Sequence, residues 1–265
     1  MLSYQHAFHA GNLADVHKHA LLAWMLDYLT RKDKPLSYIE THAGRGLYDL
    51  SGTEALKTGE AAQGIAKVAD WFDAGHPYAR ARQAVMDAHG PDSYPGSPLI
   101  AANLLRESDS LHLAELHPGE FDALRDTIRK QAKAKPVQYK LYHQDGAELV
   151  QSLCPPTPRR GLLLIDPPWE VKTDYATWPQ TIGQVAVKWN VGIIALWYPK
   201  LANRTERTMV SALQKTHPDA RVHEVRFAPA KQDHGMIGSG MFILRPPYGL
   251  DAECNRLSRQ FAFLE

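Results

Sequence analysis

The hydrophobic positions of the chain fall into short runs. Seven of these runs have the length and the apolar content of buried β-strands, and polar, glycine or proline residues follow each of them. They are LSYIET (36–41), SLHLAEL (110–116), VQYKLYH (137–143), GLLLID (161–166), VGIIALWYP (191–199), RVHEVRFA (221–228) and MFILRPP (241–247). The pattern therefore predicts seven strands.

Amphipathic stretches of helical length lie between most of these strands, at about 119–135, 173–190 and 203–216. Strands that alternate with helices predict a mostly parallel sheet with helices on both faces. The last two strands are joined by APAKQDHGMIGSG (228–240) without a helix, which predicts an antiparallel last strand. The expected class is α/β.

Two regions fall outside this alternation. Residues 12–31 predict a helix before the first strand, with Asn12 as its N-cap and Asp15 as its N3 residue. The segment from Gly46 to Ser110 is too long for one crossover, and we interpret 50–95 as a small helical insertion. We expect one domain over 1–265, with 1–31 as an N-terminal arm and helix over the active site.

Composition limits the class of protein. The 265 residues are 44% hydrophobic and 22% charged, which is typical of a soluble globular chain. No apolar run approaches the ~20 residues of a membrane span, and the N-terminus has no signal-peptide pattern. Cys154 and Cys254 predict free thiols in a reducing compartment, so we expect a cytoplasmic protein.

The net charge of +1 does not by itself indicate a nucleic-acid partner, but the basic residues are unevenly distributed. The segment 124–140 holds six Lys or Arg residues against one Asp. Such a cluster is either a surface that contacts RNA phosphates or a solvated helix face. The sequence leaves both interpretations open.

Acidic residues follow four successive predicted strands, at the edge of an open α/β sheet where ligands bind. They are Glu40, within ETHAGRG (40–46), then Glu115, Asp145 before Gly146, and Asp166. The turn at Gly44 suits either a bound adenosyl group or an ordinary bend. Glu115 suits either ribose hydroxyls or a salt bridge, and Asp145-Gly146 suits either an adenine amino group or a turn.

The tetrad Asp166-Pro167-Pro168-Trp169 has a more specific chemistry. The lone pair of an adenine N6 is delocalised into the ring, so this amine is a poor nucleophile. A carboxylate at Asp166 and the carbonyl of Pro167 can accept both N6 hydrogens and localise the lone pair, while the prolines fix the backbone. Trp169 offers a face on which an extruded base can stack. The alternative is a loop stop with a packed Trp.

The histidines near the N-terminus do not have metal-ligand spacing, and we expect no metal site. We expect instead that the segment from Tyr4 to His19 folds across the mouth of the pocket, with Tyr4, His6 and Lys18 facing a substrate. A surface arm is the alternative.

Several segments together resemble the RlmJ family, adenine-N6 methyltransferases of 23S ribosomal RNA. They are MLSYQHAFHAGNLADVHKH, ETHAGRGLYDL, YPGSPLIA, LAELHP, QDG, RRGLLLIDPPWE and ALWYP, in order from residue 1 to about 247. The resemblance implies a Rossmann-like class I fold that depends on S-adenosylmethionine. It also implies cytoplasmic action on naked or immature large-subunit RNA, usually as a monomer.

The resemblance also implies roles for individual residues. Asp166 would be the catalytic acceptor, and Tyr4 and His6 would meet the target adenosine. The residues expected at the cofactor are Lys18, His19, His42, Gly44, Ser97, Glu115, Asp145, Gly146 and Asp166. Trp169 stands where the family more often has Tyr.

The sequence therefore predicts methyl transfer from S-adenosylmethionine to the N6 of an adenine in 23S rRNA, directly and on an extruded base. One alternative changes the acceptor to DNA adenine or a protein amide, although amide methylation favours Asn where Asp166 stands. Another is a non-catalytic nucleic-acid-binding module, which the intact acids at the strand ends disfavour.

Overall fold

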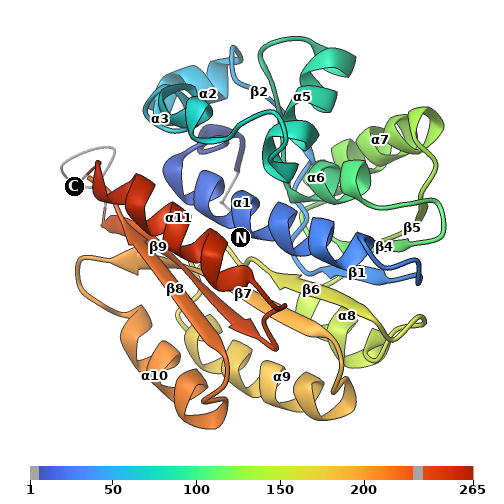
Figure 1. The fold of residues 1–265 in the computed structure, drawn as a ribbon, viewed down its shortest axis with the longest axis vertical. Helices are drawn as coiled ribbons and strands as arrows, with labels where there is room; N and C mark the ends of the chain where they lie inside the picture. The colour runs from blue at the N-terminus through green and yellow to red at the C-terminus, as the bar shows by residue number, and fades with distance from the viewer. Residues whose placement is uncertain (1–5, 229–234, 265) are drawn as a thin grey trace.

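A computed structural model describes residues 6–228 and 235–264, and seven strands form its central sheet (Figure 1). In spatial order the strands are β5 (Gln138–Tyr142), β4 (Ser110–Ala114), β1 (Ser37–Glu40), β6 (Gly161–Ile165), β7 (Ile193–Leu201), β9 (Met236–Leu244) and β8 (Arg221–Arg226). All seven predicted strands are thus confirmed.

The strand directions are also as expected. β1 pairs in parallel with β4 and β6, and the parallel pairs β4–β5 and β6–β7 extend the sheet on each side. β9 is antiparallel to both β7 and β8. After β1 the chain adds β4 and β5 on one side, and it then returns to add β6 and β7 on the other. The strand order therefore reverses between β1 and β6, where ligands bind in such sheets.

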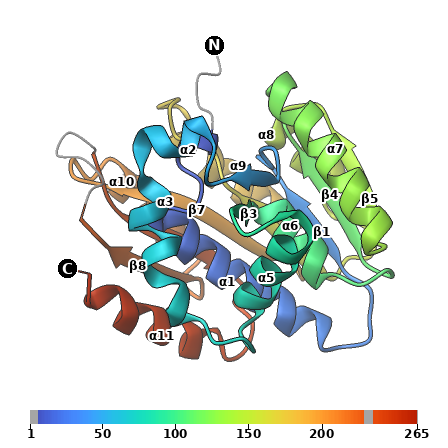
Figure 2. The ribbon, with the colours of Figure 1, turned by 90° about the horizontal axis from the view of Figure 1, so that it is seen from above.

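Helices cover both faces of the sheet and enclose two hydrophobic clusters (Figures 1 and 2). One cluster includes residues of α1 (Leu13–Thr30), α5 (Pro77–His89), α6 (Ser97–Leu104), α7 (Pro118–Ala134) and α11 (Leu250–Ala262). The other includes residues of α8 (Gly146–Leu153), α9 (Asp174–Lys188) and α10 (Glu206–Thr216). The predicted helices at 119–135, 173–190 and 203–216 correspond to α7, α9 and α10.

Helix α1 begins as predicted. The side chain of Asn12 accepts a hydrogen bond of 2.9 Å from the amide of Asp15, so Asn12 is its N-cap. The helix is buried on more than its apolar face, because Asp15, Lys18 and His19 are each less than 5% exposed. Buried ionisable groups need partners, and those partners lie at the sheet edge described below.

The segment between β1 and β4 holds the five α-helices α2 to α6 and a second, two-stranded sheet. The helices before α6 are α2 (Thr53–Thr58), α3 (Glu60–Gln63), α4 (Ile65–Val68) and α5. The strands are β2 (Leu47–Asp49) and β3 (Ser93–Pro95), which pair antiparallel and were not predicted. The division of the chain into arm, insertion and main domain stays a prediction. Within the described residues no helix is long and apolar enough to span a membrane.

Candidate active site

The carboxyl ends of β1, β4, β5 and β6 bring the four predicted acids to one edge of the sheet. Glu40 is the last residue of β1 and pairs in register with Leu113 of β4 and Leu164 of β6. Asp166 directly follows the last residue of β6. Strand pairing alone therefore brings Glu40 and Asp166 to neighbouring positions beside the reversal of strand order.

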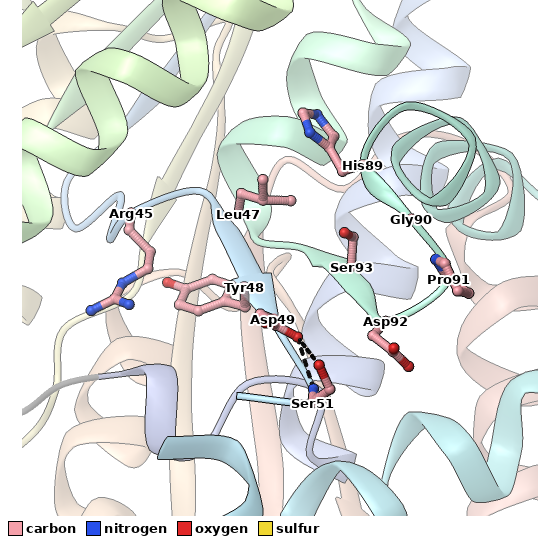
Figure 3. Close-up of a pocket in the computed structure, with 10 residues that line it drawn as sticks. All are labelled: Arg45, Leu47, Tyr48, Asp49, Ser51, His89, Gly90, Pro91, Asp92 and Ser93. Atoms are coloured by element: carbon pink, nitrogen blue, oxygen red, sulfur yellow. Dashed lines mark hydrogen bonds between the residues drawn. The ribbon is translucent and has the colours of Figure 1, made fainter. Parts of the chain in front are cut away.

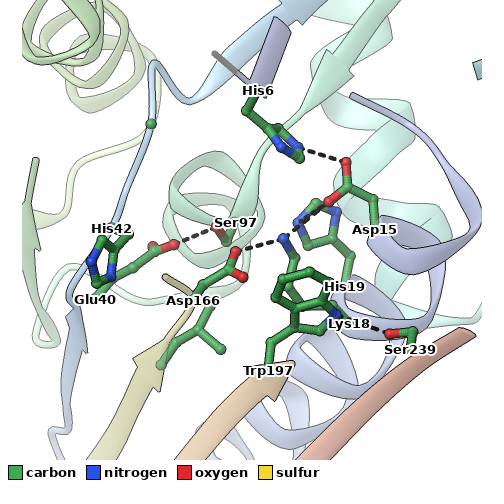
Figure 4. Close-up of polar contacts among 12 residues, drawn as sticks. His6, Asp15, Lys18, His19, Glu40, His42, Ser97, Asp166, Trp197 and Ser239 are labelled. Carbon is green, nitrogen blue, oxygen red and sulfur yellow. Dashed lines mark hydrogen bonds and ion pairs between the residues drawn. The ribbon is translucent and has the colours of Figure 1, made fainter. Parts of the chain in front are cut away.

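Asp166 is ion-paired with a lysine of α1 (Figure 4). The Nζ of Lys18 lies 2.6 Å from Oδ2 of Asp166 and 3.0 Å from Oδ1 of Asp15. Burial disfavours the charged form of Lys18, but the two carboxylates outweigh it and raise the pKa of Lys18 above its ordinary value. Lys18 is therefore a fixed cation between two acids.

Asp15 connects this ion pair to the N-terminal segment (Figure 4). Its Oδ2 lies 2.8 Å from Nε2 of His6 and accepts a 3.0 Å hydrogen bond from the amide of Gly11. Burial opposes ionisation of Asp15, but its contacts with His6 and Lys18 lower its pKa well below the ordinary value. An unbroken chain of polar contacts thus runs from His6 through Asp15 and Lys18 to Asp166.

Glu40 has a different environment, although it stands one strand away. It is fully buried and accepts hydrogen bonds from the hydroxyls of Tyr38, at 2.9 Å, and Ser97. Burial raises the pKa of Glu40 to about 8, and these two hydrogen bonds only partly oppose the shift. Glu40 is therefore mostly protonated at neutral pH.

Glu115 is held by the main chain. Its Oε2 accepts a hydrogen bond from the amide of Gly44 and its Oε1 one from the amide of His117, both at 2.8 Å. Within the described chain it makes no salt bridge, which was the alternative interpretation. Burial raises its pKa above the ordinary value. Each oxygen keeps one lone pair for a further donor.

Asp145 and Gly146 have local structural roles. Oδ1 of Asp145 caps α8 by accepting hydrogen bonds from the amides of Ala147, at 2.8 Å, and Glu148, at 3.1 Å. A Cβ on Gly146 would lie 2.4 Å from the carbonyl oxygen of Thr41, so a glycine is required for the close approach of the two loops. Neither role uses Oδ2 of Asp145.

The two expected histidines differ in exposure. His19 is 1% exposed and its Nδ1 lies 2.9 Å from the hydroxyl of Tyr94. Burial lowers the pKa of His19 to about 3 and that of His42 to about 4, so both are neutral near pH 7. His42 contacts the ring of Trp178 edge-on, with centroids 5.6 Å apart. His42 is partly exposed and the better placed of the two for a ligand.

The side chain of Trp169 is packed in the core and is not exposed to a ligand. Its backbone has a φ of 60°, its side chain belongs to the core cluster around α9, and the residue is 8% exposed. Its ring centroid lies 4.6 Å from that of Tyr175. Its Nε1 is buried and has no hydrogen-bond partner within residues 6–228 and 235–264. Stacking of a base on Trp169 stays a prediction, and it requires the ring to become exposed.

A hollow of about 480 Å³ lies next to the N-terminal segment, between β2 and the end of α5 (Figure 3). Tyr48 lines it and also contacts the ring of His6, with centroids 5.2 Å apart. The hollow carries the carboxylates of Asp49 and Asp92. Two acids disfavour a polyanion there.

The comparisons with known proteins point in one direction. A family model described as RsmJ, ribosomal RNA large subunit methyltransferase D, RlmJ, matches residues 33–262. The chain is 39% identical over 263 residues to ribosomal RNA large subunit methyltransferase J of Escherichia coli K12, covering 97% of this chain and 91% of that protein. The chain belongs to the RlmJ family.

Two further relatives agree with this assignment. The Haemophilus influenzae methyltransferase J is 37% identical over 262 residues, covering 97% of this chain and 92% of that protein. The solved structure of protein LPL1258 from Legionella pneumophila superposes with a TM-score of 0.84 at 32% identity, covering 97% and 94% of the two chains. The resemblance noted in the sequence is thus confirmed, and the α/β sheet is that of a Rossmann-like class I methyltransferase.

The structure brings most of the predicted RlmJ-family residues together, and it adds others. Tyr4 lies outside the described residues. Asp15, predicted only as part of a helix cap, proves to be an ion-pair partner of Lys18. Trp197 was also missed: Nζ of Lys18 lies 5.5 Å from its ring centroid, and its Nε1 donates a 2.9 Å hydrogen bond to Ser239. The i,i+3 spacing of Asp15 and Lys18 on the predicted helix could have indicated their ion pair, whereas no local pattern marks the contact of Lys18 with Trp197.

Proposed function

We propose that the protein methylates the N6 amino group of an adenine in 23S rRNA, with S-adenosylmethionine as methyl donor. The observation that carries this proposal is the position of Asp166, at the carboxyl end of β6 beside the reversal of strand order, followed by two prolines and paired with Lys18. Membership of a family of large-subunit ribosomal RNA methyltransferases supports it.

The chemistry of Asp166 fits an exocyclic amine. Lys18 binds Oδ2, so Oδ1 is the oxygen that accepts an N6 hydrogen. The carbonyl of Pro167 accepts the other hydrogen, and the amine is drawn toward tetrahedral geometry with its lone pair localised. Asp166 is also the nearest acceptor for the proton that the nitrogen loses. No covalent bond between enzyme and substrate is required.

Lys18 and Asp15 hold Asp166 in position. Because Lys18 is 5% exposed and contacts both carboxylates, its ammonium fixes the rotamer of Asp166. His6 binds the far side of Asp15, so the segment that we expect at the substrate is connected to the catalytic acid. Asp15 and Lys18 act here as positioning residues.

The residues at the other strand ends fit an adenosyl group. Glu115 can accept hydrogen bonds from ribose hydroxyls, and Oδ2 of Asp145 can accept one from the adenine amine. Gly44 has a φ of 60°, and a Cβ there would lie 2.5 Å from the hydroxyl of Tyr48, so a glycine is required at this turn beside Glu115. When bound, S-adenosylmethionine supplies a methyl group on a positively charged sulfur.

Ser97 and His19 belong to the same proposal with indirect roles. Ser97 donates to Glu40 and His19 contacts Tyr94, so both shape the floor of the site from beneath.

We propose further that the enzyme acts in the cytoplasm as a monomer, on free or immature large-subunit RNA, and uses no metal.

The proposal is tested with unmodified 23S rRNA made by transcription in vitro. The enzyme and S-adenosylmethionine should produce N6-methyladenosine at one position, detected by nuclease digestion and mass spectrometry. DNA of the same sequence serves as the competing substrate. Equal methylation of DNA would favour the DNA alternative, and S-adenosylmethionine binding without methylation of either polymer would contradict the proposal.

A further inference from the structure

Three exposed arginines stand beyond the ends of β7 and β8. Arg204 lies in the turn after β7, Arg207 in the first turn of α10, and Arg226 is the last residue of β8. Together with Lys200, near the end of β7, they form what we call the β7–β8 rim.

The β7–β8 rim lies at the same end of the sheet as Asp166. Ile165 of β6 pairs with Leu196 of β7, so Asp166 is level with Trp197. Lys200 is three residues further along β7, about 10 Å at the rise of a strand. The rim therefore extends outward from the catalytic edge.

Strand register gathers two of the cations around a glycine. Lys200 and Arg226 both pair with Gly238 of β9, from opposite sides. A Cβ on Gly238 would lie 3.2 Å from Cδ of Lys200 and 2.2 Å from the carbonyl oxygen of Val225, so no larger residue fits without displacement. A hollow of about 310 Å³ adjoins this place and is lined by Lys200, Arg226 and Ser258.

The arginines of the rim differ from seven other arginines of the chain in their ion pairing. Arg31, Arg45, Arg80, Arg106, Arg125, Arg221 and Arg256 all form ion pairs with carboxylates. Within residues 6–228 and 235–264 no such pair forms at Arg204, Arg207 or Arg226. The nearby Glu224 is bound to Lys200 and to Tyr198.

Helix stability does not explain this arrangement. Arg207 occupies the first turn of α10, where the positive end of the helix dipole disfavours a cation. Folding therefore gains nothing from a positive charge at this position. The guanidinium of Arg207 is exposed and open to an external anion.

We propose that the β7–β8 rim binds the phosphate backbone of the RNA that flanks the methylated adenine. This inference rests on the proposed function, and it names the surface that function uses. Arginines bind phosphate oxygens in pairs of hydrogen bonds, and such contacts fix the register of a nucleic acid without reading its bases.

The basic segment on α7 provides a matched control. Arg129, Lys130 and Lys133 are also exposed, but they lie in the half of α7 that returns toward the beginning of β5, the opposite end of the sheet from Asp166. Figures 1 and 2 show α7 and α10 on opposite sides of the molecule. The two clusters thus carry the same charge at different distances from the site.

The test compares R204A/R207A/R226A with R129A/K130A/K133A. We expect the rim variant to raise the KM for unmodified 23S rRNA about tenfold or more, with kcat at saturating RNA within twofold of wild type. The dependence of log KM on log salt concentration should lose about 2 to 3 units of slope, since each lost phosphate contact removes nearly one. The α7 variant should resemble wild type.

Binding of S-adenosylmethionine by calorimetry verifies that each variant is folded. If the triple variant does not fold, Arg207→Ala and Arg226→Ala are measured singly, and each should raise KM about threefold. A rim variant with wild-type KM and salt dependence, or an equal loss in the α7 variant, would contradict the inference while leaving the proposed function standing. A wild-type enzyme that does not methylate the RNA contradicts the proposed function instead.

Discussion

Asp166 and Glu40 are acids at the carboxyl ends of neighbouring strands, yet their environments are opposite. Asp166 is 13% exposed at its side chain and lies 2.6 Å from the ammonium of Lys18. Glu40 is completely buried, receives two hydroxyl hydrogen bonds, and burial raises its pKa to about 8. Asp166 is partly exposed beside a lysine ammonium, whereas Glu40 is kept mostly neutral inside the core.

The difference shows how two acids on one edge can have separate functions. An acceptor for amine hydrogens must be charged and reachable, which suits Asp166. A neutral acid beneath it adds little repulsion and still donates and accepts hydrogen bonds, so Glu40 can connect β1 to α6 through Ser97. Mutations at and around the two residues should therefore differ in size and in kind.

The largest effect is expected at Asp166. Asp166→Ala removes the acceptor for the N6 hydrogens, and kcat should fall about 1000-fold or more. The fold should stay intact, because Lys18 keeps its ion pair with Asp15. Methyl transfer from tritiated S-adenosylmethionine measures kcat, and near wild-type turnover would refute the mechanism. Asp166→Asn keeps the shape and should also be inactive.

This prediction depends on a residue that the sequence alone identified. The tetrad at 166–169 was recognisable because it directly follows an apolar run of strand length. The ends of such runs can be predicted from local pattern. The seven strands were found for the same reason. β2, β3 and α11 were missed, since β2 and β3 are only three residues long and α11 follows the last strand as an unremarked amphipathic stretch.

The ion pair around Asp166 could not be predicted in this way. Lys18 and Asp166 are separated by 148 positions, and only the packing of α1 on the sheet brings them together. Burial of Trp169 was only the alternative interpretation of the tetrad, because exposure of a loop aromatic depends on helix α9 and its Tyr175. Local pattern gives the elements and the acids at their ends, while tertiary packing determines which partners those acids have.

The second effect in size is expected at Asp15. Asp15→Asn removes one of the two carboxylates that hold Lys18, so Lys18 can move away from Asp166. We expect kcat to fall about 100-fold, as small misplacements of a catalytic group do, with the Kd of S-adenosylmethionine unchanged. Asp27→Asn is the control, since Asp27 lies on the same helix but pairs with Arg31 and Arg80. Unchanged kcat in Asp15→Asn would show that Lys18 alone positions Asp166.

Glu115 adds a third environment, an acid held only by backbone amides. Glu115→Ala should weaken binding of S-adenosylmethionine about tenfold, because the acceptor for the ribose hydroxyls is lost. At saturating cofactor kcat should recover to within about threefold of wild type, unlike Asp166→Ala. Calorimetry gives the Kd directly. An unchanged Kd would remove Glu115 from the cofactor site.

At Glu40 the effect should appear in stability against pH rather than in turnover. The pKa of Glu40 is raised from an ordinary 4.5 to about 8, so the folded state is favoured most below about pH 4.5 and loses that advantage as pH rises through about 8. Glu40→Gln mimics the neutral acid and should flatten this decline. Melting temperatures between about pH 5 and pH 9 should converge at low pH and separate at high pH. Parallel curves would mean that Glu40 is ionised in the folded protein.

The smallest effect on activity is expected at Trp169, where the two interpretations of the tetrad differ most. If the ring only packs on Tyr175, Trp169→Leu costs stability of about 2 to 4 kcal/mol through the cavity it leaves, and kcat/KM for RNA changes less than threefold. If a base stacks on the ring, about 1 to 3 kcal/mol of binding is lost as well. That loss would lower kcat/KM roughly tenfold or more.

The variant Trp169→Phe separates the two interpretations, because a phenyl ring still stacks a base but fills less of the cavity. At 8% exposure the ring is a core residue of this conformation, so we expect Trp169→Leu to lower the melting temperature and leave kcat/KM nearly intact. A tenfold loss that Phe restores would instead show that the loop opens when RNA binds.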